Sequence, residues 1–238
     1  MPHEVLDILQ VARYLGLSEK QVSRLASRGE LPARRVGKGF QFRKGQVDQW
    51  VEARMRGLSK ERLAGIEQGV SAHHGMDHRG HFLTPLIPVG GVIVPLPGRT
   101  RGGVLRSLAA AADEADLVYD RADLVEELEE RERLCPTTIS PGVALPHPAH
   151  PLPYNIARSF VIVGLTASGI PFGCPDGSLT RLFFLICCKD ERTHLHLLAR
   201  ISRMLLNRVT PAALMGAHDA VSLAAILHER EAAVRGEQ

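Results

Sequence analysis

The pattern of apolar and polar positions divides the chain into two blocks. In the first block, apolar side chains recur at helical spacing within short stretches that turn residues separate. Ser18 followed by Gln21 forms a capping box, which marks a helix start, and Gly29 marks the end of the same helix. Basic and aromatic residues on both sides of Gly37 and Gly39 predict a tight hairpin. The predicted elements are helices at residues 8–15, 19–27, 47–55 and 59–68 and a hairpin at residues 33–43.

The second block alternates strand-like apolar runs with amphipathic helical segments. One predicted helix, for example, has Val104, Leu105, Leu108 and Ala111 as an inner stripe. Interleaved helices and strands of this kind are typical of an α/β sandwich. The predicted strands lie at residues 89–96, 143–145, 159–165 and 182–188, and the predicted helices at residues 100–114, 121–134, 193–206 and 222–235.

A segment without periodicity separates the two blocks. Residues 69–81 are rich in glycine and histidine, which favours a linker. The sequence therefore predicts a two-domain protein of the α/β class. We expect a small helical domain with a hairpin at residues 1–56, a helix and linker at residues 57–81, and an α/β sandwich at residues 82–238.

Charge is distributed unevenly between the blocks. Residues 1–56 contain 11 Lys and Arg against 6 Asp and Glu, a net charge of +5, whereas the rest of the chain has a net charge of −2. A basic module attached to a nearly neutral one favours a polyanionic partner for the first block.

Nothing in the sequence predicts export or membrane insertion. The chain has no apolar run of about 18 residues, and its N-terminus lacks the features of a signal peptide. The four cysteines show no CxxC spacing and fit reduced thiols. We therefore expect a cytoplasmic protein.

Several ordered segments of the first block carry a family resemblance. Ile8–Ser18, Arg28–Ala33, Arg35–Gly37 and Phe42–Arg43 together resemble the excisionase/MerR-like winged helix-turn-helix family. The resemblance implies that the helix Glu19–Ser27 enters the major groove of double-stranded DNA and that the hairpin is a wing along the backbone or minor groove. A single module of this size binds weakly, so we expect a homo-oligomer.

The polar side chains of the first block fit contacts with DNA. Gln21, Ser23 and Arg24 project from the expected recognition helix and can reach base edges. An ordinary solvated surface is the alternative, but the charges cluster on this helix and on the wing. Basic side chains suited to phosphate contacts, which give salt-dependent affinity without sequence information, are Arg28, Arg34, Arg35, Lys38, Arg43 and Lys44.

The second block resembles a different family over residues 83–230. The resemblance rests on Glu130–Ile139 running into Gly142–His147, and on Asp190 ahead of His194–Ala199. Asp176-Gly177 ahead of the apolar run at residues 182–188 adds to it. The family is the fructose/mannitol/nitrogen-type IIA phosphocarriers (IIA type 2) of the bacterial phosphoenolpyruvate:sugar phosphotransferase system.

This second resemblance implies roles for four residues. His147 matches the phosphorylated histidine, and His194 matches a second active-site histidine near the phosphoryl group. Arg131 matches a nearby arginine, and Thr137 matches a hydroxyl donor. The chemistry agrees, because in-line phosphoryl transfer needs a neutral imidazole nitrogen as acceptor and donors around the equatorial oxygens. The implied phosphodonor is an HPr-type carrier protein, and a IIB protein is the recipient in sugar transport.

The residues after His147 depart from the family pattern. The family usually has a small residue there, often glycine, and then a basic residue, whereas this chain has Pro148, Ala149 and His150. Pro148 has no backbone N–H to donate to a phosphoryl group. His150 is a candidate replacement for the basic residue. We expect a slower or more specialised acceptor.

Three functions therefore remain open at the level of sequence. The first is a transcriptional regulator whose IIA-like domain is phosphorylated on His147, which fusion to a DNA-binding head favours. The second is a working phosphocarrier that passes phosphate to a IIB partner. The third is a IIA-like sensor or docking domain without phosphorylation, which Pro148 favours.

The remaining motifs predict neither a metal site nor a cofactor. P-loop, GxSxG and HExxH motifs are missing from the sequence. A histidine-rich cluster in the predicted linker has ligand types that suit a transition metal, but its spacing fits no standard site and a solvated linker is favoured. The cluster comprises His73, His74, Asp77, His78 and His81.

Overall fold

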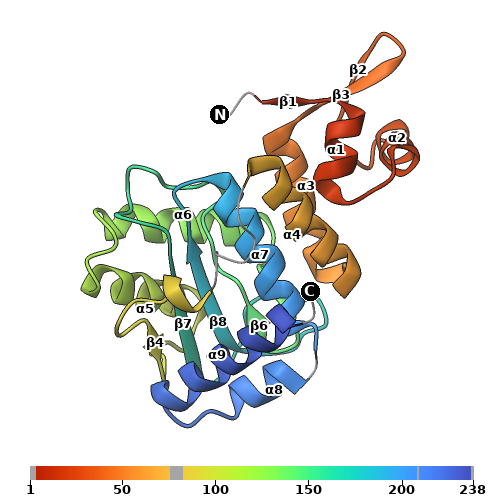
Figure 1. Ribbon diagram of the computed structural model, residues 1–238. Helices are drawn as coiled ribbons and strands as arrows, with labels where there is room; N and C mark the ends of the chain where they lie inside the picture. Colours follow the sequence, from red (N-terminus) through yellow and green to blue (C-terminus); the bar gives the residue numbers. More distant parts are fainter. Residues whose placement is uncertain (1–3, 76–82, 208, 237–238) are drawn as a thin grey trace. The chain divides into compact units, whose positions relative to one another are not determined.

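The computed structural model describes residues 4–75, 83–207 and 209–236 (Figure 1). The chain forms two compact units, Met1–Gly80 and His81–Gln238. Among the described helices, none has both the length and the apolar character needed to cross a membrane.

The first unit contains the helices and hairpin that the sequence predicts. Its sheet has the antiparallel order β1-β3-β2. Capping boxes at Asp7–Gln10 and Ser18–Gln21 begin the first two helices, and Gly29 follows the second with a positive φ. The elements are β1 (Val5–Leu6), α1 (Ile8–Leu15), α2 (Glu19–Ser27), β2 (Arg34–Val36), β3 (Gly39–Arg43), α3 (Lys44–Arg54), a short 3₁₀ helix (Met55–Gly57) and α4 (Lys60–His74).

Helix α4 is longer than the sequence indicates and packs against α1. We expected a linker from residue 69, but residues 69–74 are helical, and residues 76–81 lie outside the described residues. The linker expectation is therefore wrong for residues 69–74. A Cβ added at Gly69 would overlap the carbonyl groups of Arg13 and Tyr14, so the small residue permits the close approach of the two helices. Arg62 also donates a hydrogen bond to the Gly16 carbonyl at 2.9 Å.

The second unit is an α/β sandwich around a five-stranded sheet, which confirms the predicted class. The strand order is β4-β7-β8-β6-β5. The β4/β7 and β6/β8 pairs are parallel, and the β7/β8 and β5/β6 pairs are antiparallel. The elements are a short 3₁₀ helix (Thr84–Leu86), β4 (Val92–Ile93), α5 (Arg101–Glu114), α6 (Arg121–Leu134), β5 (Thr138–Ser140), β6 (Val143–Ala144), β7 (Phe160–Ile170), β8 (Thr180–Cys187), α7 (Glu191–Leu205), α8 (Val209–Met215) and α9 (Ala220–Gly236).

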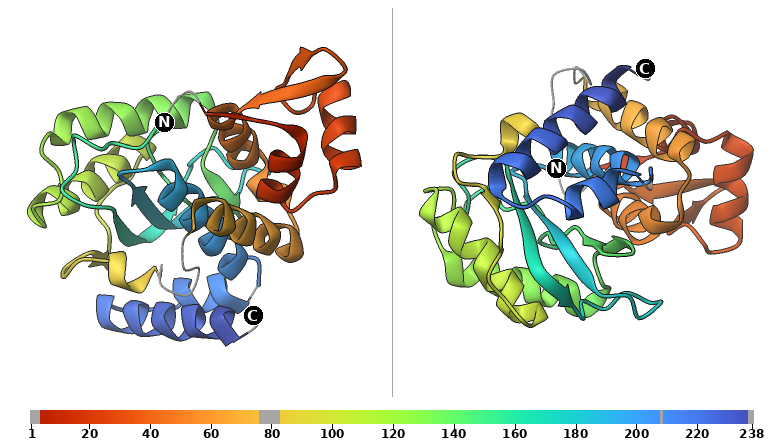
Figure 2. Two further views of the ribbon diagram at one scale, coloured as in Figure 1. Left: turned by 45° about the horizontal axis from the view of Figure 1, so that its top comes forward. Right: turned by 90° about the horizontal axis from the view of Figure 1, so that it is seen from below.

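Two layers of helices cover the two faces of this sheet. Figure 2 shows α5 and α6 on one face and α7, α8 and α9 on the other. Successive side chains of the central strands pack alternately against one helical layer and the other, because strand side chains point to opposite faces in turn. Phe160, Ile162, Phe183 and Leu185 pack with α5 and α6 in one buried cluster.

Three expectations for the second unit need correction. The strand expected at residues 89–96 is only β4, Val92–Ile93, and Val89 is fully exposed. The short elements β5 and α8 were not expected, because each is too brief to establish a periodic pattern. The strand expected at residues 159–165 continues to Ile170 through a register irregularity.

Candidate functional site

His147 lies just beyond β6, in a segment that β5 and β8 hold on both sides. The Leu145 N–H donates to the Thr137 carbonyl at 3.0 Å, and the Ile186 N–H donates to the Pro146 carbonyl at 2.9 Å. The imidazole Nδ1 of His147 lies 2.6 Å from the Leu145 carbonyl oxygen. A carbonyl only accepts, so Nδ1 is the donor. In the neutral ring, the lone pair is therefore on Nε2.

The structure brings His194 to His147. Asp190 caps α7 by accepting from the Thr193 N–H at 2.9 Å, which places His194 in the first turn of the helix. The ring centroids of His147 and His194 are 5.0 Å apart, with the planes inclined by 59°. The two histidines that are 47 positions apart in the sequence thus form one imidazole pair within the second unit.

Arg131 and Thr137 lie at the junction of α6 and β5. Arg131 donates through Nη1 to the Cys135 carbonyl at 2.8 Å, which satisfies an acceptor at the end of α6. The Thr137 hydroxyl donates to Glu132 at 2.7 Å, and the Thr137 N–H donates to the same carboxylate at 2.9 Å. Both predicted phosphoryl ligands therefore have internal partners here, and the hydroxyl proton of Thr137 points to Glu132.

Glu132 is a residue of this region that sequence reasoning missed. Its side chain is buried, and burial raises the pKa of its carboxyl, although both hydrogen bonds from Thr137 act in the opposite direction. In the sequence, Glu132 is one of several acidic residues of α6, and an acidic run of this kind indicates a solvated helix face. Glu132 accepts two hydrogen bonds from Thr137, and the Thr137 carbonyl in turn accepts one from the N–H of Leu145, two residues before His147.

In the first unit, α2 presents the residues expected to reach base edges. Arg24 is exposed, and Ser23 is partly exposed. The side-chain oxygen of Gln21 accepts from the Ser18 N–H at 2.9 Å, as the capping box requires, so the amide NH₂ is the group that Gln21 can offer to a base. Arg28, at the end of the helix, lies 3.7 Å from Glu30 in an exposed ion pair.

Lys44 differs from the other basic residues expected to contact phosphates. Its ammonium group is buried and lies 2.7 Å from Asp48. The other oxygen of Asp48 accepts from the Tyr14 hydroxyl at 2.7 Å. Lys44 is therefore part of the core of the unit, and its expected role as a phosphate contact is wrong.

The basic residues of the wing lie on both faces of the β2/β3 hairpin. Arg34 pairs with Gln41 across the β2/β3 ladder, and Arg35 pairs with Phe40. Paired residues share a face of the ladder, so Arg34 and Gln41 lie on one face and Arg35 on the other. Lys38 is exposed in the turn between the strands.

The histidines of the expected linker cluster lie partly in α4. His73 is 3.0 Å from Glu4, and its ring meets the Tyr14 ring edge-on at 5.3 Å. His74 packs beside it at 4.7 Å. These contacts give the two histidines a packing role within the first unit. The other members, Asp77, His78 and His81, lie outside the described residues.

Comparison with known proteins assigns both units to families. Residues 86–230 match the family described as "Phosphoenolpyruvate-dependent sugar phosphotransferase system, EIIA 2". The chain belongs to this family. Residues 5–55 match the family described as "Helix-turn-helix domain". The protein is therefore a helix-turn-helix domain joined to a type 2 EIIA domain.

The relatives of the EIIA domain include proteins named for nitrogen regulation and for fructose. The "Nitrogen regulatory protein" of Bradyrhizobium diazoefficiens is 29% identical over 147 residues, which cover 61% of this chain and 94% of the relative. The "PTS system fructose-specific EIIA component" of Haloferax volcanii is 25% identical over 149 residues, which cover 62% and 95%. The crystal structure of nitrogen regulatory protein IIA-Ntr from Neisseria meningitidis shares the fold, with a TM-score of 0.53 and 21% identity over 60% of this chain and 97% of that one.

Proposed function

We propose that this protein is a cytoplasmic DNA-binding regulator whose EIIA domain accepts a phosphoryl group on Nε2 of His147. The observation that carries the proposal is the 2.6 Å contact between Nδ1 of His147 and the Leu145 carbonyl, beside His194. This contact fixes the tautomer in which Nε2 is the nucleophilic nitrogen.

The transfer step uses an HPr-type phosphohistidine carrier as donor. The lone pair of Nε2 attacks phosphorus, the P–N bond of the carrier's phosphohistidine breaks, and the carrier's nitrogen recovers the electron pair. The Nδ1–H of His147 remains on the Leu145 carbonyl, which stabilises the positive charge that develops on the ring. His194, at the positive N-terminal end of α7, lies beside the incoming phosphoryl group.

Arg131 and Thr137 are supporting groups in this proposal. The Arg131 guanidinium has donors beyond the one on Cys135, and the Thr137 hydroxyl reaches a phosphoryl oxygen only by leaving Glu132. We assign Thr137 a positioning role through its backbone hydrogen bond to Leu145.

In the proposed regulator, DNA binding by the helix-turn-helix domain is the activity that phosphorylation changes. It binds double-stranded DNA through α2 and the wing, with the protein acting as a homo-oligomer. Phosphorylation adds about two negative charges to the chain, which alters its attraction to the polyanion.

The proposal is tested by intact-mass spectrometry after incubation with phosphoenolpyruvate, enzyme I and an HPr-type carrier. We expect wild type to gain one phosphoryl group and His147→Ala to gain none. Absence of the gain with several cognate carriers would contradict the phosphoacceptor role and leave the DNA-binding role standing.

Specific observations favour two other functions. The relative named as a fructose-specific EIIA component favours a working phosphocarrier. Transfer of the phosphoryl group from His147 to a IIB protein would distinguish this function from the regulator. Pro148, which removes a backbone donor next to His147, favours a sensor or docking domain that is not phosphorylated.

A further inference from the structure

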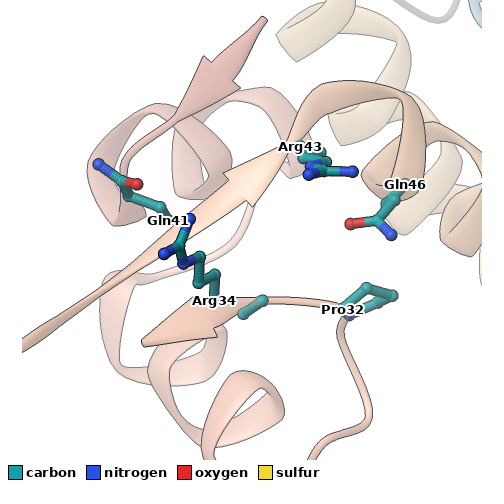
Figure 3. A pocket seen from close by; sticks show the side chains of 6 residues that line it. Pro32, Arg34, Gln41, Arg43 and Gln46 are labelled. Atoms are coloured by element: carbon teal, nitrogen blue, oxygen red, sulfur yellow. The ribbon is translucent and has the colours of Figure 1, made fainter. Parts of the chain in front are cut away.

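A cleft beside the wing of the first unit has Arg34, Gln41, Arg43 and Gln46 in its lining (Figure 3). Its arginines are among the residues already expected to contact DNA. A second pocket with charged side chains lies in the second unit, between the beginning of α5 and the end of α6. We call it the α5/α6 pocket, and none of the functions proposed above uses it.

Helical spacing explains why the lining side chains of the α5/α6 pocket converge. Arg101 and Leu105 are four residues apart at the beginning of α5, so they lie on one face of that helix. Glu129 has Glu132 and Arg133 three and four residues after it on α6, so these three also share a face. Because α5 and α6 pack against each other on the same side of the sheet, the two faces meet at the pocket.

Gly102 keeps the space open at the beginning of α5. A Cβ added there would lie 3.2 Å from both Arg106 Nη1 and Glu129 Oε1, so a side chain at this position would crowd the pocket. Thr100 caps the helix by accepting from the Gly103 N–H at 3.1 Å. The backbone N–H groups that precede Gly103 in the first turn have no partner within the helix, and the helix dipole makes this end favourable for an anion.

The lining of the pocket carries opposite charges. Arg101 and Arg133 are exposed, and within the described part of the chain no hydrogen bond or ion pair engages either guanidinium. With Glu129 and Glu132, the lining has two positive and two negative side chains and therefore no net charge. A simple anion or cation meets repulsion as well as attraction there, whereas a molecule that carries both charges can match both.

Glu132 is the buried charged group of the pocket. Its side chain is 2% exposed, and burial raises the pKa of its carboxyl by more than Thr137, Arg131 and Arg101 together lower it. Each of its oxygens accepts one hydrogen bond from Thr137 and keeps a further lone pair. An ammonium group in the pocket would therefore make a charge-assisted hydrogen bond with a carboxylate that the chain itself compensates only in part.

The size of the pocket restricts the ligand to a small molecule. Its volume is about 240 Å³, which is below the roughly 300–1,000 Å³ of pockets for drug-sized ligands. A free α-amino acid is small and carries an ammonium and a carboxylate group that are both charged at neutral pH.

We propose that the α5/α6 pocket binds a free α-amino acid. Arg101, Arg133 and the N-terminal end of α5 hold its carboxylate, and Glu132 accepts from its ammonium group. Leu105 provides an apolar wall beside it. This site depends neither on the proposed phosphorylation nor on DNA binding.

The test is isothermal titration calorimetry of the full chain with each standard protein amino acid in turn, at up to about 10 mM. We expect at least one of them to bind. Arg101→Gln and Arg133→Gln should each weaken its binding about tenfold or more, because each removes a charge-assisted hydrogen bond to the carboxylate.

Arg121→Gln is the matched control. Arg121 is exposed at the opposite end of α6, about 18 Å from Arg133 along the helix, so its substitution removes the same charge and should leave affinity unchanged. Circular dichroism of each variant verifies the fold.

Two analogues of the amino acid that binds test the role of each charge. The methyl ester lacks the carboxylate charge, and the corresponding acid without the amino group lacks the ammonium group. We expect each analogue to bind at least about tenfold more weakly. A local readout is the backbone amide resonance of Gly102 in an NMR titration, which we expect to shift when the amino acid is added.

The possible outcomes separate the parts of the proposal. If no amino acid binds at these concentrations, the proposed site is wrong. If one binds but both arginine variants retain wild-type affinity and the Gly102 resonance does not shift, the ligand lies elsewhere and the assignment to the α5/α6 pocket is wrong. If the acid without the amino group binds as tightly as the amino acid, Glu132 does not hold an ammonium group and the pocket does not select a molecule with both charges.

Discussion

At the scale of single residues, local hydrogen bonds decide which polar groups are available for function. Arg43 and Lys44 are adjacent and both basic, yet Lys44 is buried against Asp48 whereas Arg43 lines an open cleft. His147 shows the same principle, because its contact with the Leu145 carbonyl leaves the lone pair of the neutral ring on Nε2.

Pro148 gives the first prediction at this scale. Replacing it with glycine restores a backbone N–H next to His147, which can donate to the phosphoryl group in the transition state. We expect Pro148→Gly to accept phosphate about tenfold faster, the effect of roughly 1.4 kcal/mol. Timed intact-mass spectrometry measures the rate, with Pro151→Gly as a control in the same loop. An unchanged rate in Pro148→Gly would count against a slow acceptor.

Glu132 gives a prediction on pH. Burial raises the pKa of its carboxyl above the ordinary 4.5, so the folded protein keeps this proton at pH values where the unfolded chain has lost it. The folded state then binds more protons, and the contribution of Glu132 to stability falls as pH rises from about 4.5 through the raised pKa.

We expect Glu132→Gln to remove this dependence. Urea denaturation followed by far-UV circular dichroism across about pH 4 to 7 should show wild type losing stability relative to the variant. Glu130→Gln, at an exposed position on the same helix, is the control. If the free energy of unfolding depends on pH in the same way in wild type and Glu132→Gln, the buried carboxyl does not titrate as described.

At the scale of elements, short-range signals set where helices begin and end, and close packing holds one helix against another. The two capping boxes that open α1 and α2 are formed by residues three positions apart. Helix α4 ends at His74 because Gly75 follows it as a left-handed C-cap, and the extension of the helix beyond residue 68 packs against α1.

Two glycines of α4 provide a matched test of that contact. Gly69→Ala places a methyl group against the Arg13 and Tyr14 carbonyls, so we expect a loss of about 1–3 kcal/mol in the stability of the first unit. Gly65→Ala meets Gly16 only at an ordinary 3.7 Å, so its better helix propensity should leave stability unchanged or raise it by up to about 1 kcal/mol.

The fluorescence of Trp50, the single tryptophan of the chain, reports unfolding of this unit in denaturant. Equal stability of the two alanine variants would mean that α4 and α1 do not make the close contact.

At the scale of the whole molecule, the difference in net charge between the two units bears on the proposed phosphorylation. Residues 1–56 have a net charge of +5, and the rest of the chain has −2. A phosphoryl group adds about two negative charges to the second unit and so weakens the electrostatic attraction between the protein and a polyanion.

We therefore expect phosphorylated protein to bind duplex DNA more weakly than unphosphorylated protein, with the difference shrinking as salt rises. Fluorescence anisotropy before and after incubation with the phosphoenolpyruvate relay measures it, and His147→Ala under the same incubation is the control. Equal affinity of the two forms would contradict coupling between the EIIA domain and the DNA-binding domain.

The sequence by itself determined the family of each part and most of the elements. Helix α2, the hairpin, the long helices of the second unit and its central strands all follow from periodicity and caps, because these depend on residues close together in the chain. The candidate phosphoacceptor was also visible, because His147 lies in a contiguous motif after a short apolar run.

Only the tertiary structure decided how individual side chains are used. The pairing of His147 with His194, the capture of Thr137 by Glu132, the burial of Lys44 and the grouping of Arg34 with Gln46 all join segments or faces that spacing alone does not relate. The physical reason is that burial and hydrogen-bond competition depend on neighbours in space, and a charged residue has the same appearance in sequence whether it is paired or exposed.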